Sequence, residues 1–277
     1  MTSQVFKVHH LRQKVSVAEL VALFFLFFVS LVSVGAPWLA PHSTKSQSGK
    51  PFSKPSLSFL FGTDEVGRDI FSRVVMGVRS TWVSSVSIIL IGVIVGGLIG
   101  FVSGFFGGWL DKLFQRLTDL FLVLPSTMIA IAVVATLGPG LKNTVIAISI
   151  FWWPWYSRIV RSEVVAISQR PHLEAAKISG VSKSRLAMRY VLPGAAPAVL
   201  VAATLDFANV VLVTSLLSLL GLGAPAPAPE LGAMTSQSLV SLTTAWWIPV
   251  FPAIAVGLMC MASNLSGDGM RKLMESV

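Results

Sequence analysis

Long apolar segments separated by short polar ones fill most of this chain, and their lengths predict its architecture. A hydrocarbon core about 30 Å thick is crossed by roughly 20 helical residues, and a helix satisfies its own backbone hydrogen bonds there. We therefore expect an all-α, polytopic membrane protein with six transmembrane helices. Their approximate ranges are 17–39, 82–106, 117–137, 144–156, 197–220 and 248–265. The fourth is short, and it extends to residue 160 if Arg158 reaches the interface or faces protein.

The composition agrees with this pattern. Hydrophobic residues make up 54% of the chain and charged residues 12%, whereas a soluble domain contains about 25% charged residues. The mean hydropathy is +0.77 and the pI is near 10.1. Positively charged loops are usual on the cytoplasmic side of membrane proteins. We therefore attribute the basic pI to membrane orientation and expect no nucleic-acid partner.

The distribution of Lys and Arg predicts the orientation. With the N-terminus inside, 14 of the 21 Lys and Arg residues face the cytoplasm, as the positive-inside rule requires. We therefore expect both termini in the cytoplasm, although six basic residues in the segment 45–79 weaken the bias. The first apolar run is longer than the roughly 7–15 residues of a signal peptide, which favours an uncleaved anchor. The single cysteine, Cys260, excludes a disulfide within the chain.

The polar segment 161–195, between the fourth and fifth spans, has the features of a short helix followed by a turn. Ala175 and Ala176 are small, strong helix formers that allow close approach to another surface. Gly180 suits a positive φ, at which such a helix could stop. Pro193 lacks an N–H and suits the start of the next helix. An ordinary basic cytoplasmic loop is the alternative interpretation.

A second polar segment, FGTDEVGRDIFSRVVMGVRS at residues 61–80, precedes the second span. Asp64 can cap a helix whose apolar positions Ile70, Val74 and Val78 recur every four residues. The charged residues between these positions can pair along the other side of the helix. This pattern predicts an amphipathic helix that lies along the outer interface.

The fourth and fifth spans each contain an unusual feature. Trp152, Trp153, Trp155 and Tyr156 cluster at the end of the fourth span, which is typical of an interfacial aromatic belt. Asp206 lies within the fifth span, where an ionised Asp costs about 2.5–3.5 kcal/mol. It should therefore face the bundle interior or a water-filled path. It could belong to a translocation path or gate for a cationic cargo, or it could be a satisfied structural carboxylate between helices.

Several motifs resemble those of ABC-importer permeases. The spacing in the cytoplasmic segment resembles their ATPase-docking loop at Glu174, Ala175, Ala176, Gly180, Leu192 and Pro193. The outer segment resembles the second permease subunit of the dipeptide, oligopeptide and nickel import branch. The matching residues are Gly62, Thr63, Asp64, Gly67, Arg68, Asp69, Ser72, Arg73, Gly77 and Arg79. The chain departs from the usual pattern at Tyr190, where an aliphatic residue is usual, and at Leu231, where Trp is common.

This resemblance, which extends from about Gly62 to the C-terminus, implies the rest of the functional assignment. The fold would be a type I ABC-importer permease bundle in a bacterial inner membrane. Residues 1–80 would form the tail, first helix and outer segment, and residues 81–277 the core with coupling loop 161–195. The partners would be a homologous second permease, two cytoplasmic ATPases and an extracytoplasmic binding protein. The cargo would be a short peptide, nickel or a metal chelate.

The chain carries no motif for chemistry of its own. It has no Gly-x4-Gly-Lys-Ser/Thr loop for ATP phosphates, and no His-Glu-x-x-His or Gly-x-Ser-x-Gly motif. We therefore expect no enzyme activity, no metal site and no bound cofactor, with ATP and Mg used by the partner ATPases. The alternatives are a self-sufficient secondary transporter or channel, which would need paired intramembrane charges and broken helices in matching halves, and a structural membrane subunit.

Overall fold

The computed structural model describes residues 17–275, and this part of the chain is helical, with one isolated bridge between Thr63 and Asp69. The all-α prediction is therefore confirmed. The elements in order are α1 (Val17–Leu39), α2 (Ile70–Phe106), α3 (Gly108–Val123), α4 (Ser126–Leu137), α5 (Leu141–Ser168), α6 (Pro171–Ile178), α7 (Lys183–Leu186), the π-helical turn η1 (Ala187–Val191), α8 (Leu192–Leu219), α9 (Leu231–Gln237), the 3₁₀ turn η2 (Leu239–Ser241) and α10 (Trp247–Glu275).

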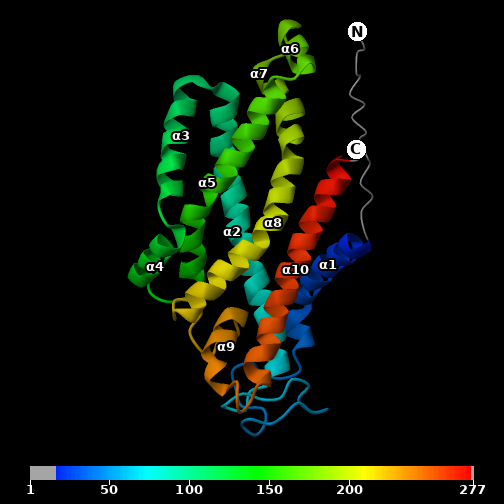
Figure 1. Cartoon of the computed structure of the whole chain (residues 1–277), viewed down its shortest axis with the longest axis vertical. Coiled ribbons are helices and arrows are strands. Elements are labelled where there is room, and N and C mark those ends of the chain that lie inside the picture. Colours follow the sequence, from blue (N-terminus) through cyan, green and yellow to red (C-terminus); the bar gives the residue numbers. More distant parts are fainter. Residues whose placement is uncertain (1–16, 276–277) are drawn as a thin grey trace, which may run out of the picture.

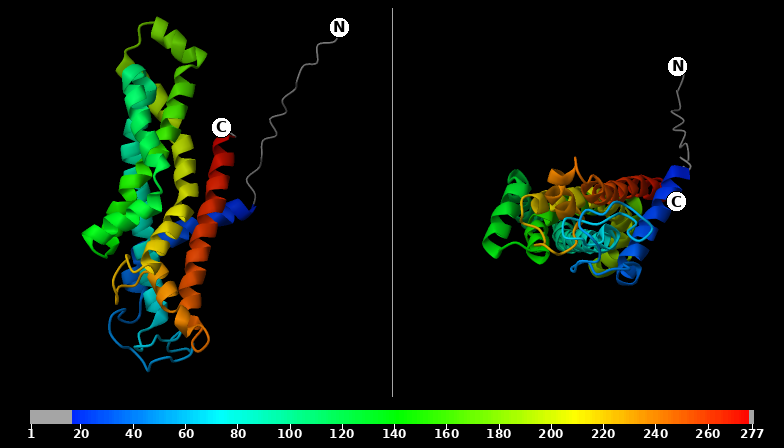
Figure 2. Two further views of the ribbon diagram at one scale, coloured as in Figure 1. Left: turned by 60° about the vertical axis from the view of Figure 1, so that its left-hand side comes forward. Right: turned by 90° about the horizontal axis from the view of Figure 1, so that it is seen from below.

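The long helices α2, α5, α8 and α10 run along the length of the molecule (Figure 1). Helix α6 lies at one end, and the irregular segment 40–69 lies with α9 at the other. Helix α1 crosses obliquely and packs against α2 and α10 (Figure 2). The cytoplasmic and outer segments predicted from the sequence are thus separated by the length of the bundle.

The expected spans differ in how well they meet the requirements for crossing a membrane. Among the described residues 17–275, three helical stretches are long and apolar enough, namely Ile70–Phe106, Lys183–Leu219 and Trp247–Lys272. Helices α3 and α4 add a fourth only if they count as one span. The apolar part of α1, Leu23–Leu39, is shorter. The expected fourth span forms the 28-residue helix α5, which continues past Arg158 into the polar segment.

The third expected span, 117–137, is not one helix. It is broken between α3 and α4, whose axes differ by 83°. Pro125 disfavours the helical conformation of the residue before it, and Leu124 accordingly adopts φ −75° and ψ 135°. The proline therefore lies between the end of one helix and the start of another.

The outer segment also differs from the expectation. Helix α2 starts at Ile70 and continues through the second span for 37 residues, so there is no separate interfacial helix over 70–80. Its N-cap is Asp69 and not Asp64, because Asp69 Oδ2 accepts a hydrogen bond from the Ser72 backbone N–H at 2.9 Å. The proposed division after residue 80 falls inside this helix.

Pro193 lies in the first turn of α8, as the sequence predicts, although α8 continues directly from the π-helical turn η1 within a helical stretch that begins at Lys183. Pro193 cannot donate to the carbonyl four residues earlier, and the Leu192 N–H bonds to the Ala187 carbonyl five residues back. The Ala-Pro stretch after α8 contains a turn closed by a 3.1 Å hydrogen bond from the Ala228 N–H to the Pro225 carbonyl.

Helices α2 and α5 approach each other closely enough for their backbones to touch. A Cβ atom on Gly96 would overlap the carbonyl oxygen of Trp153, and one on Gly100 would overlap that of Ser157. Small residues permit such contacts in membranes, where packing drives helix association. This contact fixes α5 against the longest helix of the bundle.

We predict that Gly96→Ala lowers the thermal unfolding midpoint of the purified protein, because a backbone carbonyl cannot move aside for the new methyl group. The cost should be about 1–3 kcal/mol or more, as for other overpacked sites. Gly97→Ala is the matched control, since a Cβ there meets only a Val160 methyl group at 4.0 Å. Equal midpoints for the two variants would contradict the close α2–α5 contact.

Candidate functional site

The residues of the outer family motif form a buried network of charged side chains. They do not pair along one side of an amphipathic helix, as the sequence pattern predicted. Asp64 is 2% exposed, and its Oδ2 accepts a 2.6 Å hydrogen bond from Arg68 Nε. Asp64 Oδ1 accepts from the backbone N–H groups of Val66 and Arg68 at 3.0 and 2.8 Å. Arg68 also reaches Glu65 at 3.2 Å. Gly67, at φ +81°, closes this turn with a backbone conformation that favours glycine.

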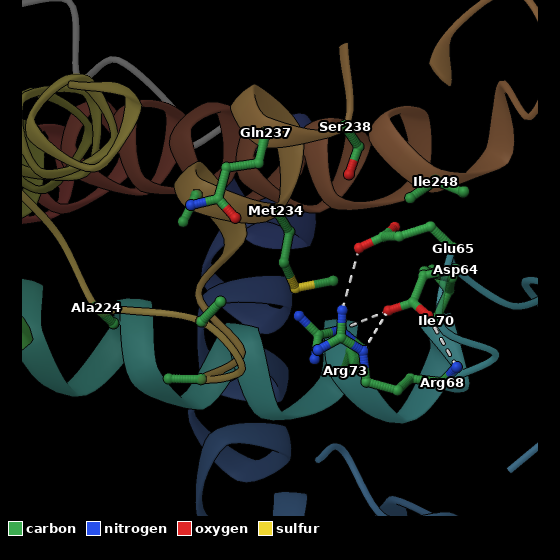
Figure 3. A pocket seen from close by; sticks show the side chains of 13 residues that line it. Asp64, Glu65, Arg68, Ile70, Arg73, Ala224, Met234, Gln237, Ser238 and Ile248 are labelled. Carbon is green, nitrogen blue, oxygen red and sulfur yellow. Dashed lines mark hydrogen bonds and ion pairs between the residues drawn. The ribbon is translucent and has the colours of Figure 1, made fainter. Parts of the chain in front are cut away.

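Arg73, which lies beside Asp64 in Figure 3, connects this turn to two other segments. Its Nη1 donates to the carbonyl of Thr44 at 2.8 Å and to that of Pro227 at 3.0 Å, and its Nε lies 3.8 Å from Asp64 Oδ2. The side chain is buried and satisfied by acceptors from three parts of the chain. Ser80 adds a hydrogen bond to the Pro229 carbonyl at 2.7 Å. These contacts attach the proline-rich loop to α2.

Thr63 and Gly62 attach the same turn to α10. The Thr63 hydroxyl donates to the Lys50 carbonyl at 2.6 Å and accepts from the Ser53 N–H at 2.8 Å. Trp247 Nε1 donates to the Thr63 carbonyl at 3.2 Å. Gly62, at φ +74°, lies where a Cβ would meet the Trp247 ring. The motif therefore joins α2, α10 and the segment 40–69 at the outer end of the bundle.

The cavity beside this network is small. Its volume is about 70 Å³, and Met234 and Gln237 of α9 line it opposite the charged residues (Figure 3). A cavity of this size holds only a few water molecules. It is too small for a peptide. The contacts of the motif are those of residues that hold neighbouring segments together.

Glu230 begins α9 next to this network. It is 2% exposed, and its two carboxylate oxygens accept from the backbone N–H groups of Gly232 and Ala233 at 3.1 and 3.2 Å. Burial raises the pKa of the Glu230 carboxyl, and hydrogen bonds from Ser218, Ala233 and Gly232 oppose this rise without cancelling it.

At the opposite end of the bundle, the predicted short helix is α6 (Pro171–Ile178). Leu173 is buried, whereas Glu174 and Ala175 are exposed and Ile178 is 88% exposed. Gly180 follows at φ +79°, so the predicted stop through a positive φ is confirmed. Helix α6 thus keeps one apolar anchor and presents a small-residue face with one carboxylate to the surroundings.

A compact apolar cluster holds α6 on the bundle. Its buried members come from α5, α6, α7, η1 and α8, and they are Val160, Val164, Ile167, Leu173, Leu186, Val191 and Ala195. Ala176 packs against this cluster from the inner side of α6. Leu192 and Pro193 lie exposed in the first turn of α8, so the structure does not bring them into the exposed face of α6. A displacement of α6 would therefore be passed to α5 and α8 through packed side chains.

The sequence analysis missed an ion pair near this cluster. Arg161 of α5 binds Asp111 of α3 through two hydrogen bonds of 2.6 and 2.7 Å. Ser103 of α2 donates to the same carboxylate. The Gly107-Gly108 turn, with both residues at positive φ, aligns α3 for this contact. A bidentate Arg–carboxylate pair fixes relative orientation as well as distance.

Asp206 lies within α8 and is 6% exposed. Trp152 Nε1 and the Tyr156 hydroxyl, both from α5, donate to its Oδ2, the latter at 3.0 Å. Trp153 and Tyr156 are buried, and among these four aromatics only Trp155 is largely exposed. The prediction that these side chains form an interfacial belt is therefore wrong for most of them, because they face neighbouring helices.

The described residues form a helical bundle with apolar spans and with the short helix α6 packed onto one end. The chain belongs to the family of binding-protein-dependent transport system inner membrane components, whose model matches residues 92–276. It is thus a permease subunit of an ABC importer and not a catalytic subunit. Membership of this family excludes the two alternative interpretations, a self-sufficient transporter or channel and a purely structural membrane subunit.

Named relatives extend this result. The chain is 40% identical over 256 residues to the glutathione transport system permease protein GsiD of Shigella flexneri serotype 5b, covering 92% of this chain and 84% of that protein. The GsiD protein of Escherichia coli O6:K15:H31 is 37% identical over the same shares. A chain of the MetNI methionine ABC transporter in inward-facing conformations shares the fold, with a TM-score of 0.52 and 19% identity over 73% of this chain and 94% of that one.

We predict that Arg73→Met destabilises the protein by about 3 kcal/mol, because it leaves a buried carboxylate with one cation fewer and two carbonyls without a donor. Thermal unfolding of the purified protein measures the effect. Lys54→Met is the control, since Lys54 is exposed in the same outer segment. An Arg73 variant as stable as this control would show that the network does not fasten the outer end.

A pH dependence follows from Glu230. Its pKa is raised on folding, so the folded state holds this proton more tightly than the unfolded state does. The resulting stabilisation is present below the unfolded-state pKa of about 4.3 and is lost as the pH rises through the folded-state pKa. The unfolding midpoint of the wild type should fall more between pH 4 and pH 8 than that of Glu230→Gln. Parallel curves for the two proteins would contradict this assignment.

Proposed function

We propose that this chain forms, with a homologous second permease, the translocation path of an importer for short peptides. Its similarity to the GsiD proteins over most of its length is the observation that carries the proposal. Those relatives are named for glutathione transport, and glutathione is itself a short peptide. This similarity favours a peptide over nickel or a metal chelate as cargo. In this proposal the Asp206 region of α8 belongs to the path.

The coupling device in this proposal is α6 with its apolar cluster. Two cytoplasmic ATPases bind ATP and Mg, and their closure moves α6 through contacts with its exposed face. The buried Leu173 and the cluster around it carry the movement to α5 and α8. The bundle then exchanges between two arrangements with different access, since a partner that binds the two states differently shifts their populations.

The charges near α6 support a cytoplasmic location for this end. Five basic residues of the segment are exposed, namely Arg170, Lys177, Lys183, Arg185 and Arg189. Lys and Arg are enriched in cytoplasmic loops. Both chain termini would then lie in the cytoplasm of a bacterial cell, and an extracytoplasmic binding protein would deliver cargo to the end fastened by Arg73.

The test is ATP-driven uptake by the reconstituted importer with Glu174→Ala and with Gly180→Pro. Each should reduce uptake and ATPase stimulation at least tenfold without loss of assembly. The first removes the only carboxylate of α6, and the second places proline at φ +79°, which its ring cannot adopt. Lys142→Gln, an exposed substitution at the start of α5, should leave uptake unchanged. Normal uptake in both α6 variants would refute the coupling role.

A further inference from the structure

A groove of about 420 Å³ opens along the bundle where α3, α4, α5 and α8 meet. Aromatic rings form much of its wall, and Asp206 is its one charged lining residue. The residues that define its chemistry are Phe121, Phe151, Trp152, Trp155, Asp206 and Asn209. The groove is large enough for a small organic group, unlike the cavity beside Arg73.

The carboxylate at this groove has donors but no cation. The Trp152 indole and the Asn209 amide nitrogen, the latter at 3.4 Å, can only donate, and Tyr156 donates from the other side. None of the ion pairs formed between residues 17 and 272 involves Asp206. These neutral donors satisfy the oxygens and leave the negative charge uncompensated, which is costly within a membrane span.

The surroundings discriminate between kinds of cation. Aromatic faces attract ammonium and guanidinium groups and remain effective where water is scarce. A divalent metal ion needs several oxygen, nitrogen or sulfur ligands, and the described residues contain no group of three His, Cys, Asp or Glu side chains that could hold one. The groove therefore fits an organic ammonium better than a bare metal ion.

We propose that Asp206 and the aromatic wall of this groove form a transient binding site for the ammonium group of a peptide during passage. This inference rests on the proposed peptide cargo and specifies how the path recognises it. The ammonium would pair with the Asp206 carboxylate while the rings of Trp152 and Trp155 replace part of its hydration. One charged contact with aromatic neighbours would hold cargo weakly enough for release.

A purely structural role for Asp206 makes a different prediction. Trp152 and Tyr156 belong to α5 and Asp206 to α8, so their hydrogen bonds also connect the two helices. The amide oxygen of Asn accepts the same bonds in nearly the same shape but carries no charge. Asp206→Asn therefore separates the charge from the helix connection, whereas Asp206→Leu removes both.

The binding experiment uses the assembled importer in detergent without its binding protein. Dialanine and N-acetyl-dialanine are titrated while tryptophan fluorescence is recorded. We expect dialanine to bind the wild type in the millimolar range and the acetylated form, which lacks the ammonium, to bind at least tenfold more weakly. Asp206→Asn should raise the dissociation constant of dialanine at least tenfold with an unfolding midpoint close to that of the wild type. Asp119→Asn, an exposed acid outside the groove, should bind as the wild type does.

Three results would overturn the inference: equal binding of the two probes, unchanged binding of dialanine by Asp206→Asn, or an Asp206→Asn protein as unstable as Asp206→Leu. ATP-driven accumulation of dialanine and glutathione is measured in vesicles containing the complete importer. This measurement distinguishes a failure of the proposed peptide cargo from a failure of the proposed ammonium site. A wild-type importer that accumulates neither peptide contradicts the proposed cargo. Accumulation that is normal in both wild type and Asp206→Asn contradicts only the ammonium site.

Discussion

The close contact between α2 and α5 positions the helix that carries the aromatic donors to Asp206 and part of the apolar cluster beneath α6. Gly96 and Gly100 allow the two backbones to touch, and no larger residue fits at either position. Helix α5 then carries the cytoplasmic apolar cluster near one end and the aromatic donors to Asp206 nearer its middle. In the proposed coupling, a movement received by α6 would reach the groove along this one continuous helix. The Arg161–Asp111 pair adds α3 to the same unit.

At the outer end, an irregular segment of about thirty residues is held in place without a regular sheet. Arg73 holds it by donating to carbonyls from two loops and lying near Asp64. This arrangement also explains part of the positive charge that weakened the predicted orientation. Arg68 and Arg73 are buried beside carboxylates, so their charges are paired within the folded protein. Lys45, Lys50 and Lys54 remain exposed.

Much of the fold could be predicted because apolar length and local turn chemistry are properties of contiguous sequence. The positions of α1, α8 and α10 and the stop at Gly180 follow from such signals. What escaped prediction depended on tertiary partners. Asp64 and Asp69 could each serve as the N-cap of α2. Asp69 is the N-cap because the Asp64 carboxylate is engaged by hydrogen bonds from Arg68. Trp152 resembled an interfacial residue because its partner, Asp206, lies 54 positions away.

The most direct test of the account is site-specific cross-linking from α6 to a cytoplasmic ATPase. In a Cys260→Ser background, which removes the only native cysteine, Ile178→Cys on the exposed face of α6 is compared with Val240→Cys, which is 90% exposed near the outer end. We predict that Ile178→Cys forms a cross-link to the ATPase that changes in yield with ATP, and that Val240→Cys forms none. The absence of any ATPase cross-link from α6 in an assembled importer would contradict the central claim that this helix couples the bundle to ATP hydrolysis.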